Sequence, residues 1–336
     1  MTQWCKQYYY VAYLSPRFCG IARLSVYRFV DCFFIIHKHS SGALHKLYAP
    51  LPPLREQYHI VKKIEELMPF VNQYATVSEK LDKLNSEFPD QVKKSILQLA
   101  VEGKLVEQRL EEGTGYELCS LIQSEKSKSS KVRDVESKIY YKGGHWYETH
   151  GKQETCIDKE IPFEIPESWT WRRFGDLMIN RDSERIPLSV AQRSKLEKRY
   201  NYYGASGVID KVDRPLFCKD LLLIGEDGAN LLNRSTPIAF IAHGEYWVNN
   251  HAHVLDTCAG LSKEYIALFI NAIDLSPYVT GTAQPKMNQQ KMNSILVSVP
   301  PRAEQERIVQ EYKKLLPFLT KLCVDGKSEK KLMSFF

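Results

Sequence analysis

Apolar residues recur over residues 60–99 at alternating intervals of four and three positions. Nine of the twelve positions on this spacing are apolar when tyrosine is counted. A repeat of 3.5 residues is typical of the seam along which coiled-coil helices pack. The pattern therefore predicts a long helical arm, with ordinary amphipathic core helices as the alternative. The seam includes Ile60, Ile64, Leu67, Val71 and Leu81.

Two prolines interrupt this helical pattern, Pro69 in its first half and Pro89 in its second. Proline inside a helix costs roughly 3 kcal/mol, because it removes a backbone hydrogen bond and its ring collides with the preceding turn. We therefore expect a kink at Pro69 and a division at Pro89. This interpretation gives a first helix over about 55–87 and a second over about 89–101.

The phrase that opens this helix occurs twice. LPPLREQYHIVKKIEELMPF begins at Leu51 and VPPRAEQERIVQEYKKLLPF at Val299, with nine of twenty positions identical at an offset of 248 residues. Each copy begins with Pro-Pro and then Glu-Gln, where proline suits the first turn and an acid complements its exposed N–H groups. The second copy predicts another helix, over about 304–325. Its apolar seam comprises Ile308, Tyr312, Leu315, Leu319 and Leu322.

Between the two copies the pattern changes. Residues 113–160 are polar and dense in charge, which predicts a mobile linker rather than packed structure. From Ile161 onward, short apolar segments alternate with Gly, Asn and Asp, which predicts strands, and residues 262–273 predict a helix with Ser262 as its N-cap. The sequence thus predicts a mixed α/β (α+β) domain. Its expected strand segments are 201–212, 220–231, 237–256 and 293–300.

Composition is that of a globular protein. The 336 residues are 43% apolar, which is ample for a packed core. The chain has no apolar run of membrane-spanning length and no segment with the order of a signal peptide, so we expect a soluble, cytoplasmic protein with no membrane partner. Its eight cysteines are widely spaced without a C-x-x-C pair, which favours reduced thiols.

The net charge of +6 is informative only together with the positions of the charged residues along the chain. The stretch from Arg172 to Arg199 holds eight Lys or Arg against four acids. Such a cluster is typical either of a nucleic-acid surface or of a solvated face of mixed charge. The sequence leaves these two interpretations open.

Catalytic motifs are absent from the sequence. Neither G-x-x-x-x-G-K-[ST] nor G-x-G-x-x-G occurs, nor does the Asn-Pro-Pro-aromatic tetrapeptide of amino-methyltransferases. His251 and His253 alternate on a predicted strand face, but no Cys or acid stands at a matching ligand spacing, and His145 is interpreted as a surface histidine. We interpret Glu226 and Asp227 as turn residues. We therefore expect a binding protein with no catalytic residue, no metal and no cofactor.

Two polar loops carry side chains suited to recognising a polymer through hydrogen bonds. GTAQPKMNQQKMNSI begins at Gly281 and WVNNHAH at Trp247. Asn and Gln can pair with adenine through two hydrogen bonds, and Lys can reach guanine or a phosphate. Amide-rich turns without a ligand are the alternative.

At this point several segments resemble a known family, the specificity subunit of type I restriction–modification systems. Together they cover about two thirds of the chain in the expected order. They are LPPLREQYHIV from Leu51, VKKSILQLAVEGKLV (92–106), FEIPESWTWRRFGDL (163–177), YYGASGVIDKV (202–212), LLLIGEDGANL (221–231), FIAHGEYWVNNHAHVL (240–255) and the segment 281–309.

The resemblance implies a DNA-binding subunit without catalytic activity. Family members carry two target recognition domains, each followed by a conserved helix, and the two helices pair antiparallel as a coiled-coil rod. Each domain reads half of a split site in double-stranded DNA, while methyltransferase subunits and an ATP-driven restriction subunit are the enzymatic partners. The expected DNA-contacting residues here are Tyr203, Ser206, Lys211, Asn230, Arg234, Asn249, Asn250, His251, Gln284, Lys286 and Asn288.

The chain departs from the family pattern at its N-terminus, where only fifty residues precede the first phrase. We expect residues 1–50 to be a truncated remnant of the first recognition domain, so that the protein is a half reader requiring self-association or a second half-subunit, or is inactive. A fused methyltransferase–specificity enzyme is opposed by the missing motifs. The expected pieces are a remnant (1–50), a helical region (51–112), a linker (113–160), a recognition domain (161–300) and a C-terminal helix (301–336).

Overall fold

The computed structural model describes residues 52–129, 137–281 and 283–323, with side chains up to residue 319. The chain divides into two compact units, residues 1–85 and 86–336, and each is described by itself. The expected remnant at 1–50 and the end of the C-terminal helix beyond Cys323 lie outside the described residues.

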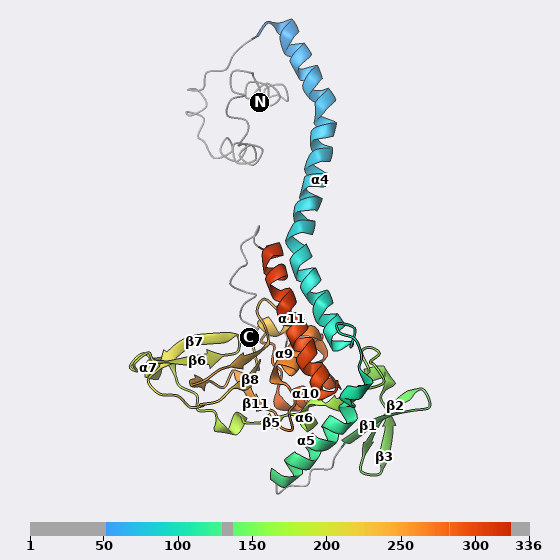
Figure 1. The fold of residues 1–336 in the computed structure, drawn as a ribbon. Helices are drawn as coiled ribbons and strands as arrows, with labels where there is room; N and C mark the ends of the chain where they lie inside the picture. Colours follow the sequence, from blue (N-terminus) through green and yellow to red (C-terminus); the bar gives the residue numbers. More distant parts are fainter. Residues whose placement is uncertain (1–51, 130–136, 282, 324–336) are drawn as a thin grey trace. The chain divides into compact units, whose positions relative to one another are not determined.

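The first described element is the helix α4, which runs from Leu54 to Val101 without interruption (Figure 1). The expected division at Pro89 is wrong, because α4 continues through both Pro69 and Pro89. Each proline removes only one backbone hydrogen bond, and the unbroken ladder on either side of it holds the helical conformation.

The predicted seam of α4 is uncovered in the first unit. Leu67, Val71 and Leu81 expose 49%, 55% and 54% of their surfaces, and Ile60 and Ile64 are partly buried. An apolar stripe of this kind is typical of a helix that packs against a partner. The antiparallel pairing of the two repeated helices remains a prediction.

The second copy of the repeated phrase opens α11, which runs from Arg302 to Cys323 and continues through Pro317. Ile308 and Tyr312 of this helix are completely buried. They belong to the same core as Leu97 and Val101, near the end of α4. The first part of the predicted α11 seam is thus covered by the unit that contains it, while Leu315 further along is only partly buried.

The expected linker at 113–160 is wrong for the residues that the structure describes there. Leu110–Glu112 form a 3₁₀ turn (η3), and Gly115–Ser129 form α5, whose Leu118 and Ile122 are buried. A small antiparallel sheet follows, in the order β1-β2-β3. Ile139 of this sheet is buried in the main core and Trp146 packs against that core, a placement that average composition does not reveal. The sheet consists of β1 (Ser137–Lys142), β2 (His145–His150) and β3 (Gln153–Cys156).

The predicted α/β domain is confirmed, including the helix capped by Ser262, whose hydroxyl accepts a hydrogen bond from the Tyr265 N–H. Its elements are η4 (Asp158–Glu160), β4 (Thr170–Arg173), α6 (Phe174–Leu177), β5 (Ile179–Asn180), η5 (Asp182–Glu184), α7 (Val190–Arg193), β6 (Tyr200–Gly204), β7 (Gly207–Val212), β8 (Leu221–Gly225), α8 (Asn230–Asn233), β9 (Ala239–Ala242), β10 (Tyr246–Val248), β11 (Ala252–Asp256), α9 (Lys263–Ala272), η6 (Ser276–Tyr278), α10 (Gln289–Asn293) and β12 (Leu296–Val299).

The central sheet has the order β5-β11-β8-β9, with each neighbouring pair antiparallel. Alternate residues of β8 point to opposite faces, so Leu222 joins the core shared with α9, while Leu221 and Leu223 join a second core. Burial on both faces explains why this strand is continuously apolar instead of alternating with polar residues.

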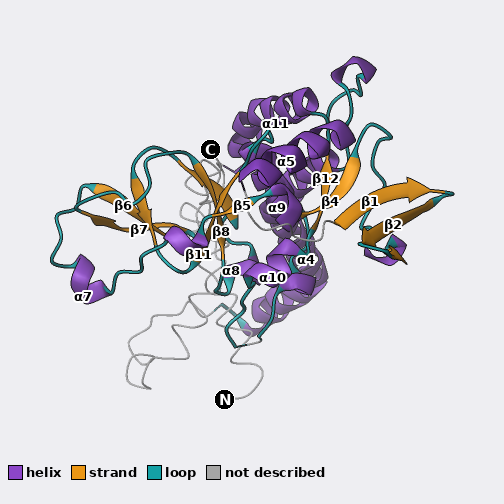
Figure 2. Ribbon diagram, turned by 90° about the horizontal axis from the view of Figure 1, so that it is seen from below, coloured by secondary structure: helices purple, strands orange, loops and turns teal. Residues whose placement is uncertain are grey.

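Two smaller sheets flank the central one. In the order β10-β6-β7, β10 pairs with β6 in parallel and β6 pairs with β7 antiparallel, while β12 pairs with β4 antiparallel. Figure 2 shows the β6–β7 hairpin and the β1–β2 hairpin at opposite ends of the second unit, with α9 and α5 between them. No helix in the described part of the chain combines the length and apolar character needed to cross a membrane.

Candidate nucleic-acid interface

Four polar segments that are distant in the sequence meet at one edge of the α/β domain. They are the turn after β6, the segment after β8, the turn before β11 and the segment 280–288. The backbone N–H of Glu226 donates to the His251 carbonyl (2.9 Å), and the N–H of Met287 donates to the Glu226 carbonyl (2.9 Å). The Asn249 N–H donates to the Tyr203 carbonyl (3.0 Å). Direct backbone hydrogen bonds therefore hold most of the predicted recognition loops together.

A glycine makes the closest of these approaches possible. A Cβ atom at Gly225 would lie 2.8 Å from the carbonyl oxygen of Ala205, which is too close for any other residue without a backbone shift. Gly225 ends β8, and Ala205 begins the turn between β6 and β7. The missing side chain thus lets the β6–β7 turn join this edge.

A charged network lies beneath the edge. Arg185 donates from Nη1 to the Glu226 carboxylate (3.0 Å), and Lys286 Nζ lies 3.1 Å from the other Glu226 oxygen. Asp182 contacts both Arg185 (3.4 Å) and His253. The sequence interpretation missed Asp182 and Arg185, because their partners His253 and Glu226 lie 71 and 41 positions away and no local motif marks such pairs.

His253 is the buried centre of this network, with 2% of its surface exposed. Its Nδ1 lies 2.6 Å from the Asp182 carboxylate and its Nε2 lies 3.1 Å from the carbonyl oxygen of Met287. Both partners are acceptors, so each contact is a hydrogen bond when the ring nitrogen that faces it carries hydrogen. His253 therefore ties β11 to the segment 280–288.

The expectation that His251 shares a strand face with His253 is wrong. His251 lies in the turn before β11, where its Nδ1 contacts the Asp227 carboxylate (2.7 Å) at the surface. The two histidines thus meet different acids. Because those acids come from other segments, ligand spacing in the sequence did not indicate them.

The network lowers the pKa values of two acids. Burial alone raises the pKa of the Asp182 carboxyl, but its hydrogen bond and charge interaction with His253, the Val254 N–H and Arg185 together lower it. Burial likewise raises the pKa of Glu226, and Arg185, His253 and Lys286 together bring it below the ordinary value. Both groups are therefore carboxylates at neutral pH.

We expect the fold to lose stability as the pH falls below about 4. The folded-state pKa values of Asp182 and Glu226 lie below the unfolded values, about 3.9 and 4.3, so their contribution is complete above those values and disappears as the acids become protonated in the folded protein. Thermal unfolding between pH 7 and pH 3 measures this. The Asp182→Asn variant should show a shallower decline, and a decline as steep as that of the unchanged chain would contradict the assignment.

Seven of the eleven predicted DNA-contacting residues present side chains at the surface. Lys286 and His251 are about half exposed, even though each pairs with an acid. Asn288 is also the N-cap of α10, where its side-chain oxygen accepts from the Lys291 N–H (2.9 Å). Their contact with DNA remains a prediction. These residues are Ser206, Lys211, Asn250, His251, Gln284, Lys286 and Asn288.

The other four predicted residues are engaged within the protein. The Tyr203 ring packs on Phe240 and Tyr246 with centroid distances of 5.8 and 5.4 Å. Asn230 donates to the Thr236 carbonyl (3.1 Å), and the Asn249 side-chain oxygen accepts from the His251 N–H (2.8 Å). These residues shape the loops, and a direct role in DNA contact remains a prediction for them as well.

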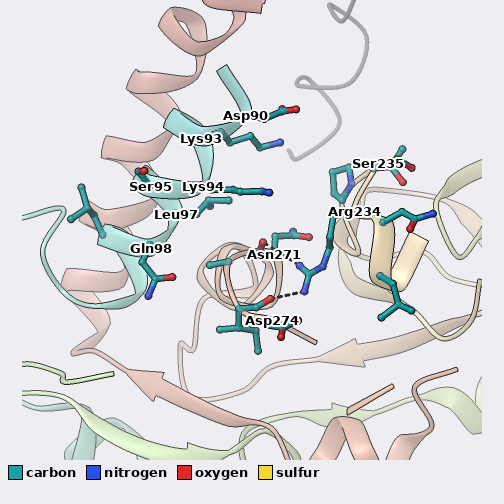
Figure 3. Close-up of a pocket in the computed structure, with 17 residues that line it drawn as sticks. Asp90, Lys93, Lys94, Ser95, Leu97, Gln98, Arg234, Ser235, Asn271 and Asp274 are labelled. Carbon is teal, nitrogen blue, oxygen red and sulfur yellow. Dashed lines mark hydrogen bonds between the residues drawn. The ribbon is translucent and has the colours of Figure 1, made fainter. Parts of the chain in front are cut away.

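Arg234 lies apart from the edge, in a groove of about 930 Å³ (Figure 3). Its guanidinium donates to the carbonyls of Ile270 and Asn271 at the end of α9, both at 3.3 Å. Burial lowers the pKa of Arg234. The groove is bounded by the 90–99 part of α4, the segment 232–237 and the segment 271–274. Arg234 thus caps a helix from a different surface than the loop residues.

The basic stretch from Arg172 to Arg199 is largely neutralised within the protein. Arg173 pairs with Glu148 (2.6 Å) and Glu160 (2.9 Å), and Arg193 pairs with Asp210 (2.9 Å). Arg181 likewise contacts Asp256 (3.2 Å). Of the two interpretations left open by the sequence, the structure favours a face of mixed charge.

The repeated phrase forms a local anchor in both copies. Gln305 Nε2 donates to the Pro300 carbonyl (3.0 Å), and Gln57 Nε2 donates to the Pro52 carbonyl (2.7 Å). In the second copy, Gln305 also accepts from the Ser262 N–H (3.0 Å), and the buried Glu304 accepts from the Trp169 indole (2.9 Å). The phrase therefore attaches α11 to the preceding domain.

Comparison with known proteins gives a consistent set of relatives. Residues 166–321 match the family model of the type I restriction modification DNA specificity domain. A Haemophilus influenzae protein described as type I restriction enzyme specificity subunit S.HindORF215P is 32% identical over 153 residues, which are 45% of this chain and 37% of that protein. The EcoAI specificity subunit of Escherichia coli is 23% identical over 332 residues, 81% of this chain and 54% of that one. The chain thus spans about half or less of the length of these relatives.

Solved structures of two specificity subunits also match. The HsdS subunit from Thermoanaerobacter tengcongensis is 15% identical with a TM-score of 0.39, over 84% of this chain and 56% of that chain. The S subunit from M. genitalium is 13% identical with a TM-score of 0.37, over 88% and 65% of the respective chains.

Proposed function

We propose that this chain recognises a DNA sequence for a type I restriction–modification complex, on the premise that residues 166–321 match the type I restriction modification DNA specificity domain. In this proposal the chain binds double-stranded DNA and performs no catalysis. Methylation and cleavage belong to separate methyltransferase and restriction subunits.

We assign DNA recognition to residues 161–300. The observation that carries this assignment is the meeting of four polar segments at one edge of the domain. Amide side chains such as those of Asn250 and Gln284 suit base edges, and a half-exposed lysine such as Lys286 suits a phosphate. The network around His253 fixes these loops before DNA arrives, which reduces the entropy lost on binding.

The charge pattern at this edge is also compatible with a DNA contact whose affinity depends on the salt concentration. Lys286 shares Glu226 with Arg185, so Glu226 keeps one cationic partner when Lys286 turns to a phosphate. Counterion release from DNA then adds to the affinity, and this contribution falls as the salt concentration rises.

Replacing Lys286 with alanine is expected to weaken DNA binding several-fold and to reduce the slope of log affinity against log salt by about one. The measurement is a titration at several salt concentrations, with duplexes selected from a random pool by the chain together with its methyltransferase partner. Lys142→Ala is the matched control, since Lys142 is exposed on the β1–β2 hairpin. An unchanged affinity and slope in Lys286→Ala would contradict the phosphate contact.

We further propose that α4 serves as part of a rod on which partner subunits assemble. Its apolar stripe, with Leu67, Val71 and Leu81 about half exposed, supports this role. We assign the helical pieces to residues 51–112 and 301–336, and their antiparallel pairing belongs to the same proposal. Methyltransferase and restriction subunits are the proposed occupants of the assembled particle.

A second candidate function is that of a half reader completed by another domain. Gln57 repeats the hydrogen bond of Gln305, yet Ile60 is only partly buried where its counterpart Ile308 is fully buried against a recognition domain. A recognition domain supplied by a second copy of this chain, or by a separate half-subunit, would cover Gln57 and Ile60 in the same way. Two identical domains related by a two-fold axis would read inverted copies of one half-site.

A further inference from the structure

The structure brings together three metal-binding side chains that the sequence kept apart. A ring nitrogen of His145, the Cys156 Sγ atom and a carboxylate oxygen of Asp158 lie within 4.8 Å of one another. His145 is exposed, as expected of a surface histidine, but it has ligand-type neighbours that the sequence did not indicate. Its neighbours come from the end of β3 and the first residue of η4, eleven and thirteen positions further along the chain.

We propose that His145, Cys156 and Asp158 form a binding site for a divalent transition metal of the zinc class. A thiolate, an imidazole and a carboxylate form a mixed donor set that suits zinc better than calcium or magnesium, which prefer oxygen alone. Three protein ligands leave a fourth position for water. His145 and Cys156 are exposed, so a metal ion can reach the site from solvent.

The backbone holds the three donors in place. Tyr147 and Cys156 are paired across β2 and β3, and the Ile157 N–H donates to the Trp146 carbonyl (2.9 Å). The Trp146 N–H also donates to the Asp158 Oδ1 atom (2.6 Å), which orients the carboxylate and leaves Oδ2 directed at His145. Such outer hydrogen bonds are what orients ligands in protein metal sites.

Only small movements separate this arrangement from a tetrahedral site. Bonds of 2.0–2.3 Å place the donor atoms of a zinc ion roughly 3.3–3.8 Å apart. His145 Nδ1 and Asp158 Oδ2 are now 2.6 Å apart and would open by less than about 1 Å, while Cys156 would approach from at most 4.8 Å. Binding would release the thiol proton of Cys156 to solvent and leave the His145 proton on Nε2.

The simpler interpretation is that the His145–Asp158 contact is a hydrogen bond that fastens the hairpin. That role requires no thiol, whereas all three donors are needed for the metal site. A bound ion would fix η4 to the small sheet, and Glu160 of η4 is already paired with Arg173 of β4 (2.9 Å). The site would thus join the sheet to the core, at the opposite end of the second unit from the β6–β7 hairpin (Figure 2).

Cobalt(II) titration of the reduced full-length chain tests the proposal. We expect a thiolate-to-cobalt charge-transfer band together with the visible bands of a tetrahedral ion, and zinc should displace both. Cys156→Ser should remove the charge-transfer band that belongs to this site, and His145→Gln or Asp158→Asn should weaken binding at least about tenfold. Cys218→Ser and His150→Gln are matched controls that should leave the spectrum unchanged, since both residues are exposed but lie outside the cluster.

Alkylation mapped by mass spectrometry separates this site from cysteines elsewhere in the chain. Equimolar zinc should slow alkylation of Cys156 at least about tenfold in the unchanged chain, but not in His145→Gln, and should leave Cys218 unaffected. Zinc protection of Cys156 that persists in His145→Gln would overturn the proposed ligand set. The absence of both protection and the cobalt band in the unchanged chain would overturn the site itself.

Discussion

Replacing Ile308 with aspartate is expected to unfold the second unit, whereas the same change at its repeat counterpart Ile60 should lower the melting temperature only slightly. Ile308 is fully buried in the core shared by α9, α11 and the end of α4, so an aspartate there would be a buried charge without a partner. We expect a loss of roughly 4 kcal/mol or more at Ile308 and of about 1 kcal/mol at partly buried Ile60. Thermal unfolding followed by circular dichroism measures both.

Further variants distinguish packing from assembly. Ile308→Val keeps a foldable core and should cost about 0.5–1.5 kcal/mol. Ile60→Asp should instead reduce self-association or binding of a partner half, as measured by light scattering, because it places a charge on the proposed docking face. Equal destabilisation by the two aspartates would contradict the difference in burial between the two copies.

Replacing His253 with alanine is expected to cost about 3 kcal/mol and to weaken DNA binding at least about tenfold. The change removes the imidazole that contacts both the Asp182 carboxylate and the Met287 carbonyl, so a largely buried carboxylate and a backbone carbonyl each lose a partner. The segment 280–288 then loses a tie to β11, and its side chains must be ordered again when DNA binds. Chemical denaturation and DNA titration give the two quantities.

His251→Ala is the matched control for the stability measurement. His251 lies two residues away but is half exposed, and surface ion pairs of this kind contribute about 0–1 kcal/mol. Stability should therefore fall much less than in His253→Ala. Unchanged stability in His253→Ala would show that the buried network does not hold the segment, and unchanged DNA affinity would show that the segment is not part of the interface.

The sequence predicted the secondary structure of the α/β domain well, because the relevant signals are local. Gly, Asn and Asp separate the apolar runs that became β6 to β11, and Ser262 begins α9 where its hydroxyl can cap the first turn. The two main errors of the sequence-based prediction arose where contacts with the rest of the fold overrode local signals. Pro89 does not end α4, and the polar residues near Leu118 and Ile122 concealed a helix that packs on the core.

The sequence by itself determined that the chain contains an α/β domain and that two helices begin with the same phrase, and it predicted that polar loops carry the binding chemistry. These features depend on neighbouring residues or on direct repetition. Only the tertiary structure decided which side chains face one another. Asp182 meets His253 across seventy-one residues, and Cys156 meets His145 across a hairpin. Hydrogen bonds and metal ligation depend on distances of a few ångströms in space, and a residue's position along the chain does not fix those distances until the sheets have formed.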